Sequence, residues 1–373
     1  MKIAIISTRG IPNNYGGFEQ FAEYISVGLV NLGHEVTVYS PHFHSYKEKS
    51  FKGVNIKHIY SPEEWMGSSI GSFFYDFFSF KDALKKQQFD IIYEAGYTSI
   101  IPAYLFFNIK KRKSPIIVTN MDGLEHQRSK FNKWAQKFIL WEEKTTTKYS
   151  HYLIADNKGI QEYYKKRYRK ESELLFYGAN IYDDYCENYL EEFKLQSNNY
   201  YLVIARLEPE NNIETIIQGF LHSNKKDEKP LIILGKTDTP FGKYLVEKYK
   251  EINSIRFLGG IYDFNKINSI RYFSSVYFHG HSVGGTNPSL LEAMASSCFI
   301  VAHDNIFNKS VLEEDALFFS SSSDVSTILS NIDDVIKENE TSFIEKNLTK
   351  IKAIYSWDKI IKAHEKYFLS LIK

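Results

Sequence analysis

A glycine turn leads directly into an amphipathic helix in the stretch Ser282-Val-Gly-Gly-Thr-Asn-Pro-Ser-Leu-Leu-Glu-Ala-Met-Ala295. The start of a helix presents unpaired N–H groups and a partial positive charge, and Gly284 and Gly285 let the backbone approach an anion closely. Glu292 lies roughly two turns further on, on about the same face as Gly285 and Pro288. The stretch therefore predicts a phosphate site beside a carboxylate that accepts hydrogen bonds from a ribose diol. An ordinary capped helix with a solvated glutamate is the alternative.

A second loop of this kind lies near the N-terminus. The apolar run Lys2–Ser7 has the composition of a buried parallel strand. A loop that ends in Gly16 and Gly17 follows it, and a helical pattern of apolar residues then runs to Gly33. The next run, Glu35–Ser40, is again strand-like, so the segment is a β-loop-α-β unit. It lacks the Gly-x-Gly-x-x-Gly fingerprint, which disfavours a nicotinamide or flavin enzyme.

Length and composition limit the class of protein. A chain of 373 residues is long enough for two domains with separate cores. The formal net charge of +1 disfavours a nucleic-acid binder with a strongly basic surface. Only two cysteines, Cys186 and Cys298, occur, and neither belongs to a metal-spaced pair, so a reducing cytoplasm fits best. No run approaches about 18 apolar residues and no signal-peptide pattern opens the chain, so we expect neither a membrane span nor a secretory signal.

Strand-like runs alternate with helix-like runs, which is the pattern of an α/β fold with parallel sheets. The polar passage Asp183–Asn188 separates two patterned halves and is the expected linker. The expected strands are Lys2–Ser7, Glu35–Ser40, Val54–Ile59, Asp90–Glu94, Ile116–Asn120, Tyr152–Ala155, Tyr200–Ala205, Pro230–Leu234, Ile255–Leu258, Val276–Phe278 and Phe299–Ala302.

The second half offers a further phosphate ligand. The expected strand Tyr200–Ala205 ends at Arg206, ahead of a helical pattern that begins at Ile213. An arginine at the carboxyl end of a strand is well placed for bidentate contact with a phosphate. A surface ion pair with Glu208 or Glu210 is the alternative.

Several segments, in a fixed order, carry a resemblance to a known family. They are Ser7-Thr-Arg-Gly-Ile-Pro-Asn-Asn-Tyr-Gly-Gly-Phe-Glu19, Asn120-Met-Asp-Gly-Leu-Glu125, Leu153-Ile-Ala-Asp156, Ala205-Arg-Leu-Glu-Pro-Glu-Asn-Asn212, Gly284-Gly-Thr-Asn-Pro-Ser-Leu-Leu-Glu-Ala-Met-Ala295 and Tyr355-Ser-Trp-Asp-Lys359. With these segments, which span almost the whole chain, the protein resembles the retaining GT-B glycosyltransferases of family 4. Within that family it resembles the bacterial rhamnosyltransferase-like branch that builds capsule, O-antigen or wall polysaccharide.

The resemblance implies a fold and a set of site residues. It implies two Rossmann-like domains that face one another across a cleft: residues 1–180 on the acceptor side and residues 181–355 for the nucleotide sugar. Residues 356–373 are then a helix that crosses back to the first domain. By motif position, the residues implied to bind the donor are Arg206 at the diphosphate, Glu292 at the ribose, Gly285, Thr286 and Asn287 at the phosphate or sugar, and Gly16 and Gly17 at the transferred sugar or phosphate.

Two positions depart from the wider family. Gly284 stands where many relatives have a glutamate that holds a donor hydroxyl, and Asn211 stands where many have a phosphate-binding lysine. We keep Asn211 in the expected donor site. Both departures are compatible with the rhamnosyltransferase-like branch, so a dTDP-linked deoxysugar, L-rhamnose, is the expected donor.

The resemblance also implies the reaction. It implies transfer with retention through same-face attack, with Asp122 and Arg206 as the expected catalytic residues. Asp122 stands where many relatives have a histidine near the reacting sugar; it can orient a substrate or act as a base, and a loop-capping role is the alternative. No Asp-x-Asp motif is present to hold a divalent ion, so we expect neither a metal nor another cofactor.

The expected acceptor is a lipid-linked saccharide. The basic clusters Lys110–Lys113 and Lys165–Lys170, with Phe131 and Trp134 near other basic residues, suggest peripheral contact with an acidic membrane at the inner face of the cell membrane. Solvated helix ends are the alternative for these clusters. A sugar-nucleotide 2-epimerase and a non-catalytic sugar-nucleotide-binding protein on the same fold are the alternative functions.

Overall fold

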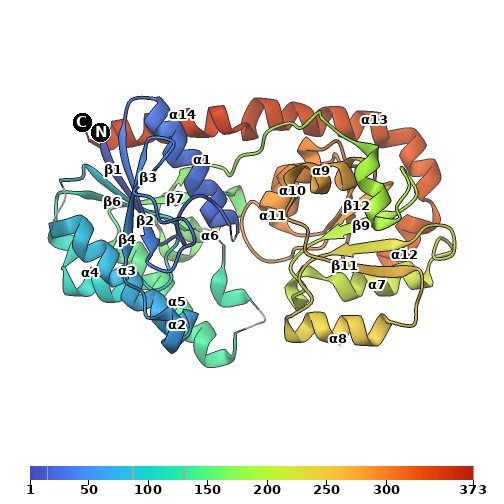
Figure 1. The fold of residues 1–373 in the computed structure, drawn as a ribbon, viewed down its shortest axis with the longest axis horizontal. Helices are drawn as coiled ribbons and strands as arrows, with labels where there is room; N and C mark the ends of the chain where they lie inside the picture. Colours follow the sequence, from blue (N-terminus) through green and yellow to red (C-terminus); the bar gives the residue numbers. More distant parts are fainter. Residues whose placement is uncertain (15, 86–87, 122, 129–130, 373) are drawn as a thin grey trace. The chain divides into compact units, whose positions relative to one another are not determined.

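The computed structural model describes residues 1–14, 16–85, 88–121, 123–128 and 131–372, which form two structural units (Figure 1). Unit 1 contains the chain up to His126, Phe131–Tyr177 and the C-terminal helix. Unit 2 contains Gln127, Arg128 and Gly178–Ser356. Each unit is built around a largely parallel sheet, so the expected α/β class with two such domains is confirmed.

The strands of unit 1 lie in the order β3-β4-β2-β1-β5-β6-β7-β8, with parallel neighbours except for the pair β3 and β4. Their bounds are β1 Lys2–Ile6, β2 Glu35–Pro41, β3 Ser50–Phe51, β4 Val54–Ile59, β5 Ile91–Glu94, β6 Ile116–Asn120, β7 Tyr152–Ala155 and β8 Glu173–Leu174. The helices are α1 Gly17–Asn31, α2 Glu63–Met66, α3 Ser68–Lys85, α4 Ile101–Phe106, α5 Lys133–Tyr149, α6 Lys158–Tyr168 and α14 Trp357–Leu371, with short 3₁₀ turns η1 Ile109–Lys111 and η2 Glu125–Gln127.

The strands of unit 2 lie in the order β11-β10-β9-β12-β13-β14 and are all parallel. Their bounds are β9 Tyr201–Ile204, β10 Leu231–Leu234, β11 Ile255–Gly259, β12 Val276–His279, β13 Ile300–His303 and β14 Leu317–Phe319. The helices are α7 Ile213–His222, α8 Pro240–Tyr249, α9 Phe264–Tyr272, α10 Pro288–Ala295, α11 Ile306–Leu312, α12 Ser322–Ser330 and α13 Ile332–Lys350, with shorter helical segments η3 Glu187–Phe193, η4 Pro209–Asn211 and η5 Ile351–Tyr355.

The C-terminal helix α14 packs beside α1, although the two are far apart in the sequence (Figure 1). The ring of Trp357 stacks on that of Tyr24, with 4.4 Å between the ring centroids, and the ring centroid of the buried Phe21 lies 6.2 Å from that of Trp357. Tyr177, the last residue of the preceding segment of unit 1, donates a hydrogen bond to the carbonyl oxygen of Gly17 at 3.1 Å. None of the described helices is long and apolar enough to cross a membrane.

Each sheet has one place where the strand order reverses direction. In unit 2 this place lies between β9 and β12, and in unit 1 it lies between β1 and β5. Loops that leave neighbouring parallel strands at such a place run in opposite directions, and ligands bind in the crevice between them at the carboxyl ends of the strands. The loops at the carboxyl ends of β9 and β12 are therefore expected to form a ligand-binding site in unit 2.

Candidate nucleotide-sugar site

The loops that follow β9 and β12 are hydrogen-bonded to each other. The side-chain amide of Asn212 donates to the carbonyl oxygen of Gly280 at 2.8 Å. In the other direction, the backbone N–H of Ser282 donates to the carbonyl oxygen of Glu210 at 3.0 Å, and its hydroxyl donates to the same oxygen at 2.8 Å. Gly280 permits this approach, because a Cβ atom there would lie 2.1 Å from the carbonyl oxygen of Asn211. The two loops thus form one fixed platform.

The glycine turn of this platform leads into α10. Gly284 has a φ of +125°, a backbone conformation that only glycine adopts readily. Thr286 is buried, and the side chain of Asn287 caps the helix by accepting a hydrogen bond from the backbone N–H of Ser289 at 3.0 Å. The predicted helix start is therefore present, with Gly285, Thr286 and Asn287 directly before its first turn.

Arg206 lies at the carboxyl end of β9, and its side chain is exposed. Within the described part of the chain no carboxylate pairs with it, so neither Glu208 nor Glu210 neutralises the guanidinium. The buried amide of Asn211 donates to the carbonyl oxygen of Arg206 at 2.7 Å. Asn211 therefore supports the backbone of Arg206, whose charge is left available to an anion.

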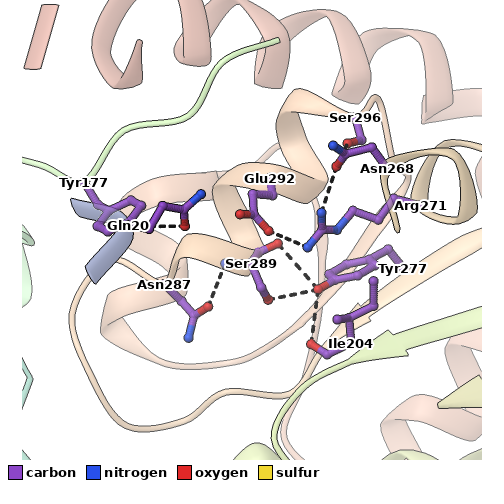
Figure 2. A network of polar contacts seen from close by, with 10 residues as sticks. All are labelled: Gln20, Tyr177, Ile204, Asn268, Arg271, Tyr277, Asn287, Ser289, Glu292 and Ser296. Atoms are coloured by element: carbon purple, nitrogen blue, oxygen red, sulfur yellow. Dashed lines mark hydrogen bonds and ion pairs between the residues drawn. The ribbon is translucent and has the colours of Figure 1, made fainter. Parts of the chain in front are cut away.

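Glu292 forms an ion pair with Arg271 from α9 (Figure 2). Nη2 of Arg271 lies 2.5 Å from Oε2 of Glu292, and Nη1 of Arg271 donates to Oδ1 of Asn268 at 2.8 Å. The Arg271 side chain is 3% exposed, whereas the Glu292 side chain is 25% exposed. One face of the carboxylate is thus fixed by a buried cation while part of the group remains open to a ligand.

Tyr277 links the end of β9 to the first turn of α10 (Figure 2). Its hydroxyl donates to the carbonyl oxygen of Ile204 at 3.4 Å and exchanges a hydrogen bond with Oγ of Ser289 at 3.0 Å. Burial raises the pKa of Tyr277 to about 12, so the phenol stays protonated and keeps its donor at neutral pH. Tyr277 therefore fixes the end of β9, which Arg206 follows, relative to the helix that carries Glu292.

Two further residues of the site, His281 and Arg128, were missed by sequence reasoning. Burial and the positive charges of Arg206 and Arg128 lower the pKa of His281 to about 3, so its imidazole is neutral. Its buried Nδ1 has no hydrogen-bond partner among the described residues. Nη1 of Arg128 lies 3.9 Å from Oε1 of Glu210. Two arginines thus influence one imidazole at the same edge of the sheet, which is a suitable electrostatic environment for an anion.

The expected glycines of unit 1 begin α1, the helix that follows β1. Gly16 is the N-cap residue in extended conformation, and Gly17 is the first helical residue. The loop before them is fixed by two carboxylates of α1: Glu19 accepts from the backbone N–H of Arg9 at 2.9 Å, and Glu23 accepts from that of Asn13 at 2.8 Å. These glycines belong to unit 1, whereas Arg206, Asn211, Gly285, Thr286, Asn287 and Glu292 belong to unit 2.

The predicted catalytic residue Asp122 lies outside the described residues. Its neighbours are described: the backbone N–H of Met121 donates to the carbonyl oxygen of Ile154 at 2.8 Å, and that of Glu125 donates to the hydroxyl of Tyr97 at 3.1 Å. The position therefore follows the carboxyl end of β6, and its role stays a prediction.

Unit 1 also buries several carboxyl groups near the carboxyl ends of β1 and β5. Oγ of Ser99 donates to Oδ2 of Asp76 at 2.5 Å, and the backbone N–H of Ser99 donates to Oε1 of Glu142 at 3.0 Å. Burial raises the pKa of Asp76 and of Glu142 to about 7 each, and that of Glu94 at the end of β5 to about 8. Among the residues that the structure describes, no group of three or more His, Cys, Asp or Glu is arranged to hold a metal ion.

Comparison with known proteins places this geometry in context. Residues 1–180 match the family described as "Domain of unknown function (DUF1972)", and residues 187–350 match "Glycosyl transferases group 1". A search of curated proteins gave no significant match.

Three solved structures that resemble the chain over its whole length are distant from it in sequence. Sucrose-phosphate synthase from Thermosynechococcus elongatus has a TM-score of 0.78 and 15% identity, covering 99% of this chain and 98% of that one. Anabaena HepE in complex with UDP-glucose has a TM-score of 0.75 and 13% identity, covering 99% and 100%. A glycosyltransferase from Rickettsia africae has a TM-score of 0.73 and 12% identity, covering 100% and 98%. At these identities the likeness shows a shared fold.

Proposed function

We propose that this chain, which has the GT-B fold of group 1 glycosyltransferases with a DUF1972 N-terminal domain, transfers a sugar from a nucleoside diphosphate to a saccharide acceptor. The observation that carries the proposal is the exposed guanidinium of Arg206, unpaired by any described carboxylate. It lies at the carboxyl end of β9 at the reversal of strand order, on the loop bonded to the one that leads into α10. Nucleoside diphosphates bind at such places in doubly wound sheets.

Unit 2 supplies the groups that a nucleoside diphosphate needs. Arg206 and the N–H groups at the start of α10 bind the diphosphate, and the open part of the Glu292 carboxylate accepts a hydrogen bond from the sugar of the nucleoside. Gly285, Thr286 and Asn287 lie at the phosphate or the transferred sugar, and Asn211 supports Arg206 from behind. Gly16 and Gly17 of unit 1 are proposed to approach the transferred sugar or phosphate.

In the reaction that we propose, the bond from the anomeric carbon to the diphosphate breaks as the acceptor oxygen attacks from the same face. The acceptor proton passes to an oxygen of the departing phosphate, and the configuration at the anomeric carbon is retained. Arg206 stabilises the charge that develops on the leaving group, as pre-organised cations do in phosphate sites. Neither a metal nor another cofactor is required for this charge stabilisation. Asp122 is proposed to orient a substrate, or to act as a base that takes the acceptor proton in place of the phosphate.

The proposed donor is dTDP-L-rhamnose. The family resemblance supports this choice, together with Gly284, where a glutamate of the wider family would hold a donor hydroxyl. The φ of +125° at Gly284 is strained for any other residue, so this loop is built without a side chain at that position. HepE, one of the similar structures, was solved with UDP and glucose and with UDP-glucose, which supports a nucleotide sugar as the class of donor.

The proposed acceptor is a lipid-linked saccharide on the route to capsule, O-antigen or wall polysaccharide, at the inner face of the cell membrane. The decisive experiment offers the purified protein a panel of dTDP-, UDP- and GDP-sugars with membrane extract and measures release of free nucleotide. We expect release with dTDP-rhamnose. A preference for a UDP- or GDP-hexose would overturn the donor but leave sugar transfer standing. Isomerisation of the donor would instead indicate a 2-epimerase, and tight binding without turnover would indicate a non-catalytic binding protein.

A further inference from the structure

Three neighbouring helices of unit 1, α3, α4 and α5, expose large apolar side chains on one surface. Trp134 is 81% exposed and Phe106 is 70% exposed, and Phe74, Phe138 and Trp141 are also exposed. We call this surface the aromatic surface; Figure 1 labels the three helices that carry it, α3, α4 and α5. Such a concentration of exposed rings marks an interaction site in a folded protein.

Ring contacts join the three helices into a continuous surface. Phe77 of α3 lies 5.3 Å from Phe106 of α4, measured between ring centroids. Phe73 of α3 lies 6.0 Å from Phe138 of α5, and Phe138 lies 5.5 Å from Trp141. The rings therefore form one patch across α3, α4 and α5.

The helices α3, α4 and α5 expose lysine side chains beside these aromatic rings and expose no acidic side chain. Every residue of α3, α4 and α5 is described, and the acids on them, Asp76, Asp82, Glu142 and Glu143, are all buried. The exposed charged side chains on these helices are lysines: Lys81, Lys85, Lys133, Lys137, Lys144 and Lys148. Lys110–Lys113, directly after α4, are also exposed. The whole chain carries a formal net charge of only +1, so this positive charge is local.

The combination of aromatic rings and lysines selects the kind of partner. Rings of Trp and Phe insert at the headgroup level of a bilayer, and lysines around them attract anionic lipids. Lysine is depleted from protein–protein interfaces, which disfavours a folded protein as the partner. Lys137 lies with its Nζ 5.5 Å from the ring centroid of Trp134, so cation and ring occupy the same place on the surface.

We propose that α3, α4 and α5 dock this protein onto an anionic lipid bilayer, with Trp134, Phe138 and Trp141 inserted among the headgroups. The inference extends the lipid-linked acceptor of the proposed function, because docking brings unit 1 to such an acceptor. The other basic cluster, Lys165–Lys170, takes no part: Lys165 and Lys166 form ion pairs with Glu171 and Glu162, each at 3.1 Å.

Co-sedimentation with vesicles tests the proposal without donor or acceptor. Vesicles of phosphatidylglycerol and phosphatidylcholine are compared with vesicles of phosphatidylcholine alone, at low and high salt. We expect the full-length protein to bind the anionic vesicles and to lose binding at high salt. The double variant Trp134→Ser, Trp141→Ser should lose about tenfold or more of its partitioning. Failure of the full-length protein to bind anionic vesicles would overturn the proposal.

Matched controls separate docking from unfolding and from general stickiness. Trp65 on α2 is 72% exposed but follows Glu63 and Glu64, so Trp65→Ser should keep vesicle binding. The double variant Lys133→Gln, Lys137→Gln should lose it, whereas Lys165→Gln, Lys166→Gln should not. An equal loss of vesicle binding in the control variants would also overturn the proposal. So would self-association of the unmodified protein that the double variant Trp134→Ser, Trp141→Ser abolishes while that variant still binds vesicles. Sugar transfer to a detergent-dissolved acceptor without vesicle binding would refute docking alone; vesicle binding without transfer would refute the proposed function alone.

Discussion

Nη2 of the buried Arg271 lies 2.5 Å from Oε2 of Glu292, and this ion pair fixes the carboxylate on α10 while part of it remains exposed. The carboxylate of Glu292 has two proposed roles. It compensates a cation that has little contact with water, and it presents an acceptor to the proposed nucleoside. We therefore expect a substitution at Glu292 to change both the stability of unit 2 and the affinity for the proposed donor.

We expect Glu292→Ala to lower the free energy of unfolding by about 3 kcal/mol, because Arg271 then keeps a buried charge without its carboxylate. Glu292→Gln retains an oxygen that accepts from Arg271, so it should cost less stability while it weakens donor binding. Denaturant unfolding and calorimetric titration with the donor measure the two effects. Glu162→Ala, which removes an exposed i,i+4 pair with Lys166, is the control and should cost at most about 1 kcal/mol. Donor affinity unchanged in Glu292→Gln would remove the carboxylate from the donor site.

Arg206→Ala should weaken donor binding by about 1.5 to 3 kcal/mol, the range for loss of a hydrogen bond to a charged group. Its stability should match that of the unmodified protein, because the side chain is exposed and no described carboxylate depends on it. Lys226→Ala is the control. It removes an exposed positive charge from the loop before β10, which lies at the amino ends of the strands of the same sheet. Calorimetric titration that found the same dissociation constant for both variants would contradict the assignment.

Sugar transfer should survive exhaustive chelation. The charge that develops on the leaving diphosphate is met by Arg206 and the start of α10 in the proposed mechanism, so removal of divalent ions leaves the stabilising groups in place. Nucleotide release is measured with and without EDTA. Activity that disappeared with EDTA and returned with magnesium or manganese would show that these groups are insufficient.

The sequence predicted the sheets well because buried parallel strands are short apolar runs between polar loops. The bounds of β4, β6 and β7 match the expected ones, and the other expected strands are confirmed to within one residue at each end. The short strands β3, β8 and β14 were missed, since two or three residues carry no recognisable period. The predicted helix after the glycine turn is present as α10, which begins at Pro288, because a turn that leads into an amphipathic pattern is a local signal.

The sequence does not predict which side chains of the candidate site form pairs. Arg271 and Glu292 lie on different helices, and only the packing of α9 against α10 brings them together. Asn211 could not be recognised as a support for Arg206, because its hydrogen bond depends on the turn of η4. Arg128 and Glu210 are even further apart in the chain, and no local pattern joins them. In the sequence Arg128 stands between His126 and Lys130, and this spacing does not by itself indicate a phosphate site.

The buried carboxyl group of Asp76 should make stability depend on pH. Burial raises its pKa to about 7, so the folded protein holds a proton that the unfolded chain releases at a lower pH. The unfolded state thus binds fewer protons between about pH 4 and 7, and the free energy of unfolding falls as the pH rises through this window. Glu142 and Glu94, with pKa values raised by burial to about 7 and about 8, act in the same direction.

Asp76→Asn removes one of these titrations while its amide oxygen can still accept from Ser99. We expect the variant to lose less stability than the unmodified protein between pH 5 and pH 8, measured by denaturant unfolding at several pH values. Asp358→Asn, at an exposed pair with Lys362, is the matched control and should keep the original slope. An identical slope in Asp76→Asn would mean that Asp76 is already ionised in the folded protein at low pH.

Arg128 is predicted to supply the second positive charge for the donor diphosphate. Its charge and that of Arg206 both lower the pKa of His281, and its Nη1 lies 3.9 Å from the Glu210 carboxylate on the platform. Position 211, where many relatives have a lysine, carries an asparagine engaged with the backbone. Arg128→Gln should therefore weaken binding of a nucleoside diphosphate about tenfold, roughly 1.4 kcal/mol, and that of the matching monophosphate less.

Calorimetric titration with both nucleotides measures this difference, and Lys133→Gln, which removes an exposed positive charge five residues further along the chain, is the control. The comparison of diphosphate with monophosphate separates a direct contact from a loosened platform, because loosening would weaken both nucleotides alike. If Arg128→Gln bound the diphosphate as tightly as the unmodified protein, Arg206 and the N–H groups of the glycine turn would have to hold it without a second arginine. Equal weakening of both nucleotides would instead assign Arg128 to the support of Glu210.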